Sequence, residues 1–183
     1  YQDVRIGEKI LLDDGKIEVL VIEITADKCV RVRVLNPGIL LPKKGVNLPD
    51  TKISLPSLSE KDLHDLDFII SQNIDWVALS FVRRPDDVIE LRKILESKNS
   101  TAKIISKIEK PEALEHIREI ILASDAVMVA RGDLGVELPL EQIPMIQKNI
   151  IRKCIHRAKP VIIATQMMES MIDRIKPNRS EIT

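Results

Sequence analysis

The feature that most constrains the fold is a regular alternation of short apolar runs and helical patterns beyond residue 70. The segments that follow the first three runs place apolar residues at helical spacing, over 84–97, 110–124 and 139–158. Strands that alternate with helices in this way form a parallel sheet, so the sequence predicts an α/β fold. The predicted strands lie in four runs: DWVALSF (75–81), KIISKI (103–108), AVMVA (126–130) and PVIIATQM (160–167).

Two arrangements of a parallel sheet fit this alternation, a closed barrel and an open, doubly wound sheet. The strands are apolar on both faces, as expected of strands that helices cover. We favour the barrel, because no glycine-rich GxGxxG turn follows any strand, whereas every strand ends in polar residues. In a parallel barrel, the carboxyl ends of the strands carry the chemistry.

Residues 1–48, called the β-unit below, have a different pattern. An Asp14–Gly15 turn lies between two apolar-rich runs, which is a strong hairpin signal. A third strand follows at CVRVRVL (29–35), where valines alternate with arginines, so that one face is apolar and the other polar. We predict a small antiparallel domain over 1–48 and the main α/β body over 49–183.

Composition argues against several classes of function. The 28 basic and 28 acidic residues give zero formal net charge, and aromatic residues make up 2%, so a nucleic acid partner is not expected. Cys29 and Cys154 lack the spacing of a disulfide framework or a zinc site. No apolar run approaches the ~20 residues of a membrane helix, and the first ten residues, YQDVRIGEKI, have no apolar segment of the signal-peptide type. We expect a cytoplasmic protein without a membrane partner and, since the first residue is not Met, a piece of a longer chain.

The predicted strand KIISKI has charged residues at its carboxyl end and directly after it, namely Lys107, Glu109 and Lys110. Charged side chains at the end of a buried strand need an explanation. Side chains alternate across a strand, so Lys107 and Glu109 project to one side while Ile108 projects to the other. One interpretation is that the strand leaves the core and its last residues meet water. The other is that a cation and an anion meet at the mouth of a barrel.

The next strand ends in RGDLG, where glycines allow backbone N–H groups to approach a ligand closely. Asp133 is placed to join Glu109 as a hard oxygen ligand for Mg²⁺, which takes one or two carboxylates and completes its shell with substrate and water. An ordinary strand-to-helix turn remains the alternative. The last strand brings Thr165 and Gln166 to the same level, and that hydroxyl can bind a substrate or cap the following turn. Ser80, which closes the first strand, is predicted to edge the site.

Six motifs make the sequence specific enough to compare with a family. In this order and spacing they closely resemble pyruvate kinase, over nearly the whole chain. Small departures, LPD and PNRSE where many members have LPG and PTRAE, concern a linker and a helix start. The motifs are KKGVNLP (43–49), SEKD (59–62), SFVR (80–83), IISKIE (104–109), MVARGDLGVE (128–137) and PVIIATQMMESM (160–171).

The resemblance implies a (β/α)₈ barrel, of which this chain would hold strands four to seven, with part of an inserted antiparallel β lid domain. It implies Mg²⁺- or Mn²⁺-dependent transfer of phosphate from phosphoenolpyruvate to ADP, giving pyruvate and ATP. It also implies K⁺ whose ligands lie outside this chain, and a homotetrameric parent.

The resemblance also assigns roles to individual residues. Lys107 would stabilise charge on the phosphoryl group and the enolate, and Thr165 would stand beside the reacting carbon. The other implied residues are Glu109 and Asp133 for the metal, Arg131, Gly132, Asp133 and Ser80 for the substrate, and Asp13, Asp14 and Lys44 on the lid for the nucleotide.

Two other readings stay open. A different barrel enzyme that forms an enolate on Mg²⁺, such as a lyase or an aldolase, would use Glu109 and Asp133 equally well, although it has no need for a lid over a nucleotide. As a piece, the chain would be an incomplete barrel with exposed sheet edges, which tend to pair with other chains. We therefore expect no useful turnover from these 183 residues alone.

Overall fold

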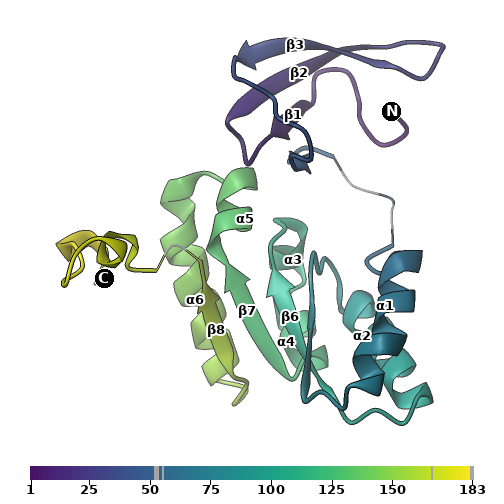
Figure 1. Ribbon diagram of the computed structural model, residues 1–183, viewed down its shortest axis with the longest axis vertical. Helices are drawn as coiled ribbons and strands as arrows, with labels where there is room; N and C mark the ends of the chain where they lie inside the picture. Colours follow the sequence, from purple (N-terminus) through teal and green to yellow (C-terminus); the bar gives the residue numbers. More distant parts are fainter. Residues whose placement is uncertain (52–53, 55, 166, 182–183) are drawn as a thin grey trace.

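The computed structural model describes residues 1–51, 54, 56–165 and 167–181. Figure 1 shows an antiparallel sheet near the N-terminus, and below it a parallel sheet with helices packed against it. The predicted mixed α/β class is therefore confirmed.

The β-unit forms a sheet with the strand order β3-β2-β1-β4. The predicted hairpin is present, and its turn needs backbone that few residues adopt: Asp13, Asp14 and Gly15 all have positive φ angles of 51°, 56° and 83°. A fourth, two-residue strand that the sequence pattern did not reveal pairs with β1. The strands are β1 (Lys9–Leu12), β2 (Ile17–Ile24), β3 (Val30–Asn36) and β4 (Val46–Asn47).

The third strand packs differently from its prediction. Its alternation predicts a buried apolar face, but Val32 and Val34 are exposed. The buried apolar side chains of these strands come instead from β2, namely Ile17, Val19 and Val21, and from β1, namely Leu11. Because β3 lies at one edge of the sheet, its apolar side chains reach solvent although they alternate correctly.

The body contains the predicted parallel sheet, with its four strands in chain order. Their carboxyl ends are in register: Leu79 is opposite Ser106, Ile108 opposite Val129, and Ala130 opposite Ala164. Residues that follow these ends therefore meet at one edge of the sheet. The strands are β5 (Trp76–Leu79), β6 (Lys103–Ile108), β7 (Ala126–Ala130) and β8 (Val161–Ala164).

The helices begin and end close to their predicted positions, with two differences. The pattern over 110–124 predicts one helix, but the chain leaves helical geometry at His116 (φ −111°, ψ 17°) and forms two. The RGDLG segment, expected to be a turn, is already helical from Arg131. The helices are α1 (Glu60–Ser71), α2 (Pro85–Ser97), α3 (Glu112–Glu115), α4 (Ile117–Ala123), α5 (Arg131–Glu137) and α6 (Ile143–Ile155), with single 3₁₀ turns at Leu140–Gln142, Glu169–Ile172 and Arg179–Glu181.

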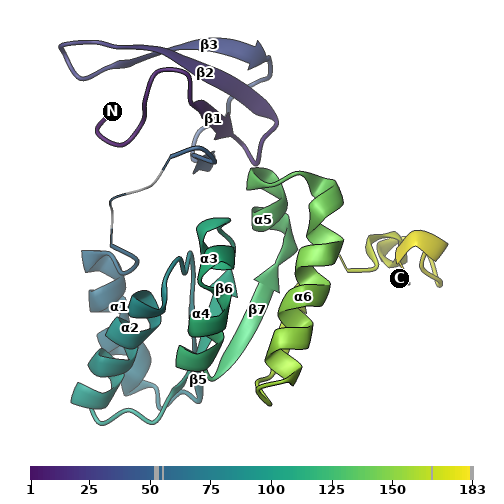
Figure 2. The same cartoon turned by 180° about the vertical axis from the view of Figure 1, so that it is seen from behind.

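Helices cover one face of the parallel sheet. Helix α4 contacts both α2 and α6, and Figure 2 shows α4 and α6 in front of the strands. On the covered face, Ile104, Val127 and Val129 are fully buried, whereas on the other face Trp76 and Ile162 are 40% and 39% exposed. The expectation of strands covered on both sides is therefore wrong for this chain: the second face, which also carries Lys103 and Lys107, is open to solvent.

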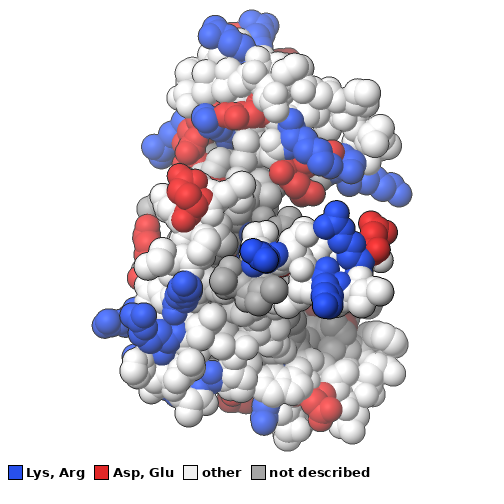
Figure 3. All heavy atoms as spheres, turned by 90° about the vertical axis from the view of Figure 1, so that its left-hand side faces the viewer, with Lys and Arg blue, Asp and Glu red and all other residues white. Residues whose placement is uncertain are grey.

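The surface follows from the balanced composition. Basic and acidic side chains are interspersed on the face drawn in Figure 3. Within the described part of the chain, no helix is both long and apolar enough to cross a bilayer.

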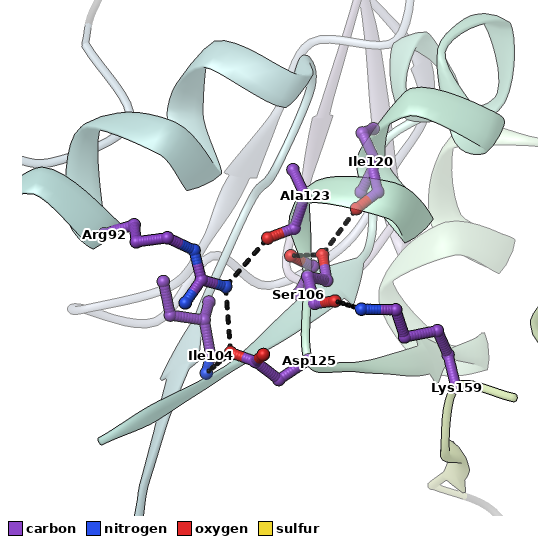
Figure 4. Close-up of polar contacts among 8 residues, drawn as sticks. Arg92, Ile104, Ser106, Ile120, Ala123, Asp125 and Lys159 are labelled. Atoms are coloured by element: carbon purple, nitrogen blue, oxygen red, sulfur yellow. Dashed lines mark hydrogen bonds and ion pairs between the residues drawn. The ribbon is translucent and has the colours of Figure 1, made fainter. Parts of the chain in front are cut away.

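A polar network joins the elements at the amino ends of the strands (Figure 4). Asp125 lies between α4 and β7, and its Oδ2 accepts hydrogen bonds from Arg92 Nη2 at 2.8 Å and from the Ile104 N–H at 2.9 Å. Arg92 also donates to the last carbonyl of α4, and Lys159 Nζ donates to the carbonyl of Ser124 at 2.6 Å. The network thus ties the end of α4 to α2, to β6 and to the segment before β8.

We expect Asp125→Asn to lower the free energy of unfolding by about 1.5–3 kcal/mol at pH 7, the scale of hydrogen bonds to a charged group. Burial alone would raise the pKa of the Asp125 carboxyl, but the Ile104 N–H and the Arg92 guanidinium outweigh it and hold the pKa below the ordinary 3.8. The stabilisation is therefore complete above pH 3.8 and is lost as the pH falls through the lower folded-state pKa.

Urea unfolding at pH 7 and at pH 3 measures this effect. The matched control is Asp67→Asn, which breaks an exposed ion pair with Lys98 on the surface and should cost less than ~1 kcal/mol. An equal difference between wild type and Asp125→Asn at both pH values would contradict the assignment.

Candidate functional site

The carboxyl end of β6 carries the ion pair that the alternation predicts. Lys107 Nζ lies 2.6 Å from Glu109 Oε1 and donates a hydrogen bond to Ser80 Oγ, at the end of β5, over 3.2 Å. The Lys107 side chain is 25% exposed and that of Glu109 only 2%. The interpretation that the strand simply ends in water is therefore wrong for Glu109, whose carboxylate is buried next to an ammonium group.

The buried Glu109 carboxylate is satisfied on both oxygens. Oε1 pairs with Lys107, and Oε2 accepts the backbone N–H of Phe81 at 2.6 Å. A buried charge is costly unless it is paired and hydrogen-bonded, and these two partners meet that requirement. The loop after β5 and the end of β6 are consequently fixed to one another by this buried carboxylate.

The ends of β7 and β8 form a second contact. The N–H of Gly132 donates to Thr165 Oγ1 at 3.0 Å, and Arg131 Nη2 donates to the Thr165 carbonyl at 2.6 Å. A Cβ at position 132 would lie 3.1 Å from Thr165 Oγ1, so glycine is what allows this close approach. Thr165 itself is exposed and has a positive φ of 65°. Gln166, predicted beside it, lies outside the described residues.

Asp133 lines a cavity that the Lys107–Glu109 pair does not line. It is exposed and lines a cavity of about 350 Å³ between the β-unit and the body, which Arg83 and Lys110 also line from the body and Asp14 and Asn47 from the β-unit. Over residues 1–51, 54, 56–165 and 167–181, three or more His, Cys, Asp or Glu side chains do not gather into a group that could hold a metal ion. A site made of two carboxylates and completed by substrate and water is smaller than such a group, so the pairing of Glu109 with Asp133 at a metal stays a prediction.

Of the three predicted site residues in the β-unit, Asp13 and Lys44 form an ion pair, whereas Asp14 lines the cavity. Asp13 is buried and pairs with Lys44 at 2.9 Å and Lys16 at 3.1 Å. The hydrogen bonds from Lys44 and then Lys16 hold the pKa of the Asp13 carboxyl below its usual value. Asp14 is exposed and lines the 350 Å³ cavity. Asp13 and Lys44 therefore stabilise the hairpin region together, while Asp14 faces the body.

Sequence reasoning missed a buried pair formed by Lys110 and Glu137. Their side chains are 10% and 2% exposed, and Asn47 of the β-unit donates to the same Glu137 oxygen at 3.0 Å. Strand alternation places Lys110 on the opposite side from Glu109, so it drew no attention. The available signal was its position directly after a strand end in a run of charges.

These features describe an α/β protein whose polar site lies at the carboxyl ends of parallel strands, under an antiparallel β-unit. The chain matches the family model described as pyruvate kinase, barrel domain, over residues 1–183. It is 51% identical over 180 residues to pyruvate kinases of Staphylococcus epidermidis and Staphylococcus aureus, covering 98% of this chain. This chain belongs to the pyruvate kinase family, as the resemblance predicted. It spans 31% of the length of those relatives.

Proposed function

We propose that this chain is the central part of a pyruvate kinase, which moves the phosphoryl group of phosphoenolpyruvate to ADP. In the reaction, the bond between phosphorus and the enol oxygen breaks, a bond to the terminal oxygen of ADP forms, and the enolate takes up a proton to give pyruvate. The observation that carries the proposal is the ion pair of Lys107 with the buried Glu109 carboxylate at the end of β6, in a chain of this family.

The architecture supports a place in a (β/α)₈ barrel. Four parallel strands in chain order with helices on one face are what four consecutive barrel strands would look like, because the other face would line the barrel interior. A doubly wound sheet would carry helices on both faces. We assign residues 49–183 to strands four to seven of the barrel and residues 1–48 to part of an inserted lid.

The reaction asks for positioning and charge neutralisation rather than covalent help. Lys107 would place its ammonium charge against the phosphoryl group in flight and the enolate oxygen. The backbone at Arg131, Gly132 and Asp133 would bind the substrate carboxylate, and the Thr165 hydroxyl, already held by the Gly132 N–H, would stand beside the reacting carbon. Ser80 would edge the site through its bond to Lys107.

Glu109 and Asp133 fit Mg²⁺ or Mn²⁺ by the chemistry of their oxygens, since such ions take one or two carboxylates and complete their shell with substrate and water. When bound, the ion would neutralise negative charge on the substrate. K⁺ is expected in the full-length protein, with ligands outside these residues. We further propose a homotetramer in the cytoplasm.

The β-unit would act as the lid over the nucleotide, with Asp14, Asp13 and Lys44 as its nucleotide-side residues. Asp14 supports this role most directly, because it lines the cavity between the two parts of the chain. Closure of such a lid excludes water from the transfer. The alternative of an Mg²⁺-dependent enolate-forming lyase or aldolase is not favoured, because the family match names a kinase.

A lactate-coupled assay on the full-length protein tests the proposal. We expect ATP formation from phosphoenolpyruvate and ADP that requires Mg²⁺, and ADP binding that calorimetry detects in its presence. The 183-residue segment alone, assayed in parallel, should show no useful turnover. A full-length protein that binds no ADP would contradict the proposed function, and near-parental rates from the segment would contradict its dependence on the rest of the barrel.

A further inference from the structure

One carboxylate joins the β-unit to the body. Glu137, the last residue of α5, accepts a hydrogen bond from Asn47 Nδ2 of β4 at 3.0 Å and forms an ion pair with Lys110 through the same Oε1 atom. The side chains of Glu137 and Lys110 are nearly inaccessible to solvent. We call Asn47, Lys110 and Glu137 the Glu137 junction.

The junction is connected to the Lys107–Glu109 site. Lys110 follows Glu109 directly, and its Nζ lies 6.0 Å from the centroid of the Phe81 ring. The backbone N–H of Phe81 in turn donates to Glu109 Oε2. The chain segments after β5, β6 and β7 are therefore connected by a short series of contacts, which includes the buried Glu109 carboxylate.

The junction also lies beside the cavity between the two parts of the chain. Asn47 and Lys110 both line this cavity, together with Asp14 of the β-unit and Asp133 of α5. A ligand held between the β-unit and the body would depend on their relative placement. A buried ion pair is a suitable anchor for that placement, because its geometry is fixed by the cost of leaving either charge unpaired.

We propose that Asn47 and Glu137 are positioning residues that hold the β-unit over the cavity for a nucleoside diphosphate, with Lys110 fixing Glu137 in place. The inference rests on the proposed function and adds the residues that set nucleotide affinity without touching the reacting atoms. Asn47 acts through Glu137, so the two contribute as one unit.

The test uses the full-length protein. Asn47→Ala should raise the KM for ADP by about 10- to 100-fold, the scale of one hydrogen bond to a charged group, while kcat and the KM for phosphoenolpyruvate change by less than about twofold. Asn47→Asp should have a larger effect, because it sets a second carboxylate against Glu137. The matched control is Asn36→Ala, which removes an asparagine bonded within the β-unit, to the Lys16 carbonyl, and should leave all three constants unchanged.

A second experiment tests whether Asn47 acts through the buried pair. Replacing only Lys110 or only Glu137 would leave an unpaired buried charge and could prevent folding, so both are replaced together. Lys110→Met with Glu137→Met replaces the buried pair by apolar side chains of similar size, which proteins often tolerate. In this background the KM for ADP should already be raised, and adding Asn47→Ala should change it by less than about twofold. Full, additive effects of Asn47→Ala in that background would overturn the proposal.

A measurement that does not depend on activity distinguishes the proposed function from the proposed role of the Glu137 junction. Hydrogen exchange at the backbone amides of β4 should become faster in Asn47→Ala and in the double replacement, without added substrate. If the wild-type protein made no ATP, the proposed function would fail, yet the exchange data would still report the junction. If it made ATP and neither β4 exchange nor the KM for ADP responded, the junction alone would be refuted.

Discussion

Replacing Lys107 with Met should lower turnover of the full-length protein by at least ~100-fold, the scale of a lost group that stabilises transition-state charge. Met fills much of the same space but brings no charge, so the phosphoryl group and the enolate would lose the ammonium that the proposed mechanism assigns to them. The KM values should change far less than kcat, because the charge develops mainly as the reaction proceeds.

The same strand offers a control for this variant. Lys103 lies at the amino end of β6, on the same face as Lys107, where its Nζ is 5.2 Å from the centroid of the Trp76 ring. Lys103→Met removes an equal charge at the amino end of β6, away from the proposed site, and should keep turnover within about twofold of wild type. Wild-type turnover in Lys107→Met would remove Lys107 from the mechanism.

Glu109→Gln should also lower turnover by at least ~100-fold, and should raise the Mg²⁺ concentration needed for half-maximal activity by at least ~10-fold. Gln has the shape of Glu and keeps an oxygen that can accept the Phe81 N–H, but it removes the charge that pairs with Lys107 and would hold the metal. Titrating Mg²⁺ at saturating substrates measures both effects.

Glu112→Gln is the matched control for this second variant, because it removes a carboxylate three residues away, in the first turn of α3. It should leave the Mg²⁺ dependence unchanged. If Glu109→Gln were slow but showed the wild-type Mg²⁺ dependence, Glu109 would orient Lys107 rather than bind the metal.

Local patterns in the sequence predicted the elements well. The alternation of apolar runs and helical spacing identified all four parallel strands, and the Asp14–Gly15 signal identified the hairpin. The same reasoning failed where tertiary packing determines the outcome. In β3 the valines alternate as predicted, but they are exposed because the strand lies at an edge of its sheet. This reasoning also failed at His116, where one helical pattern is divided into two helices.

The candidate site was predictable in part for the same reason. Lys107 and Glu109 are two residues apart on one strand, so strand geometry alone brings them together. Asn47 and Glu137 are 90 residues apart, and only the packing of the β-unit on α5 makes them neighbours. Thr165 and Gly132 were both noted as candidates, but their direct hydrogen bond depends on how β7 and β8 align.

The network around Asp125 bears on how such a protein can change over evolution. Through Arg92, Lys159 and Asp125 it connects the segments at the amino ends of the parallel strands, which is the end opposite to the proposed chemistry. Substitutions at the carboxyl ends of the strands can then alter ligand preference without disturbing the Asp125 network. New specificities would accordingly arise in the loops that follow the strands, while the turns that precede them tolerate little variation.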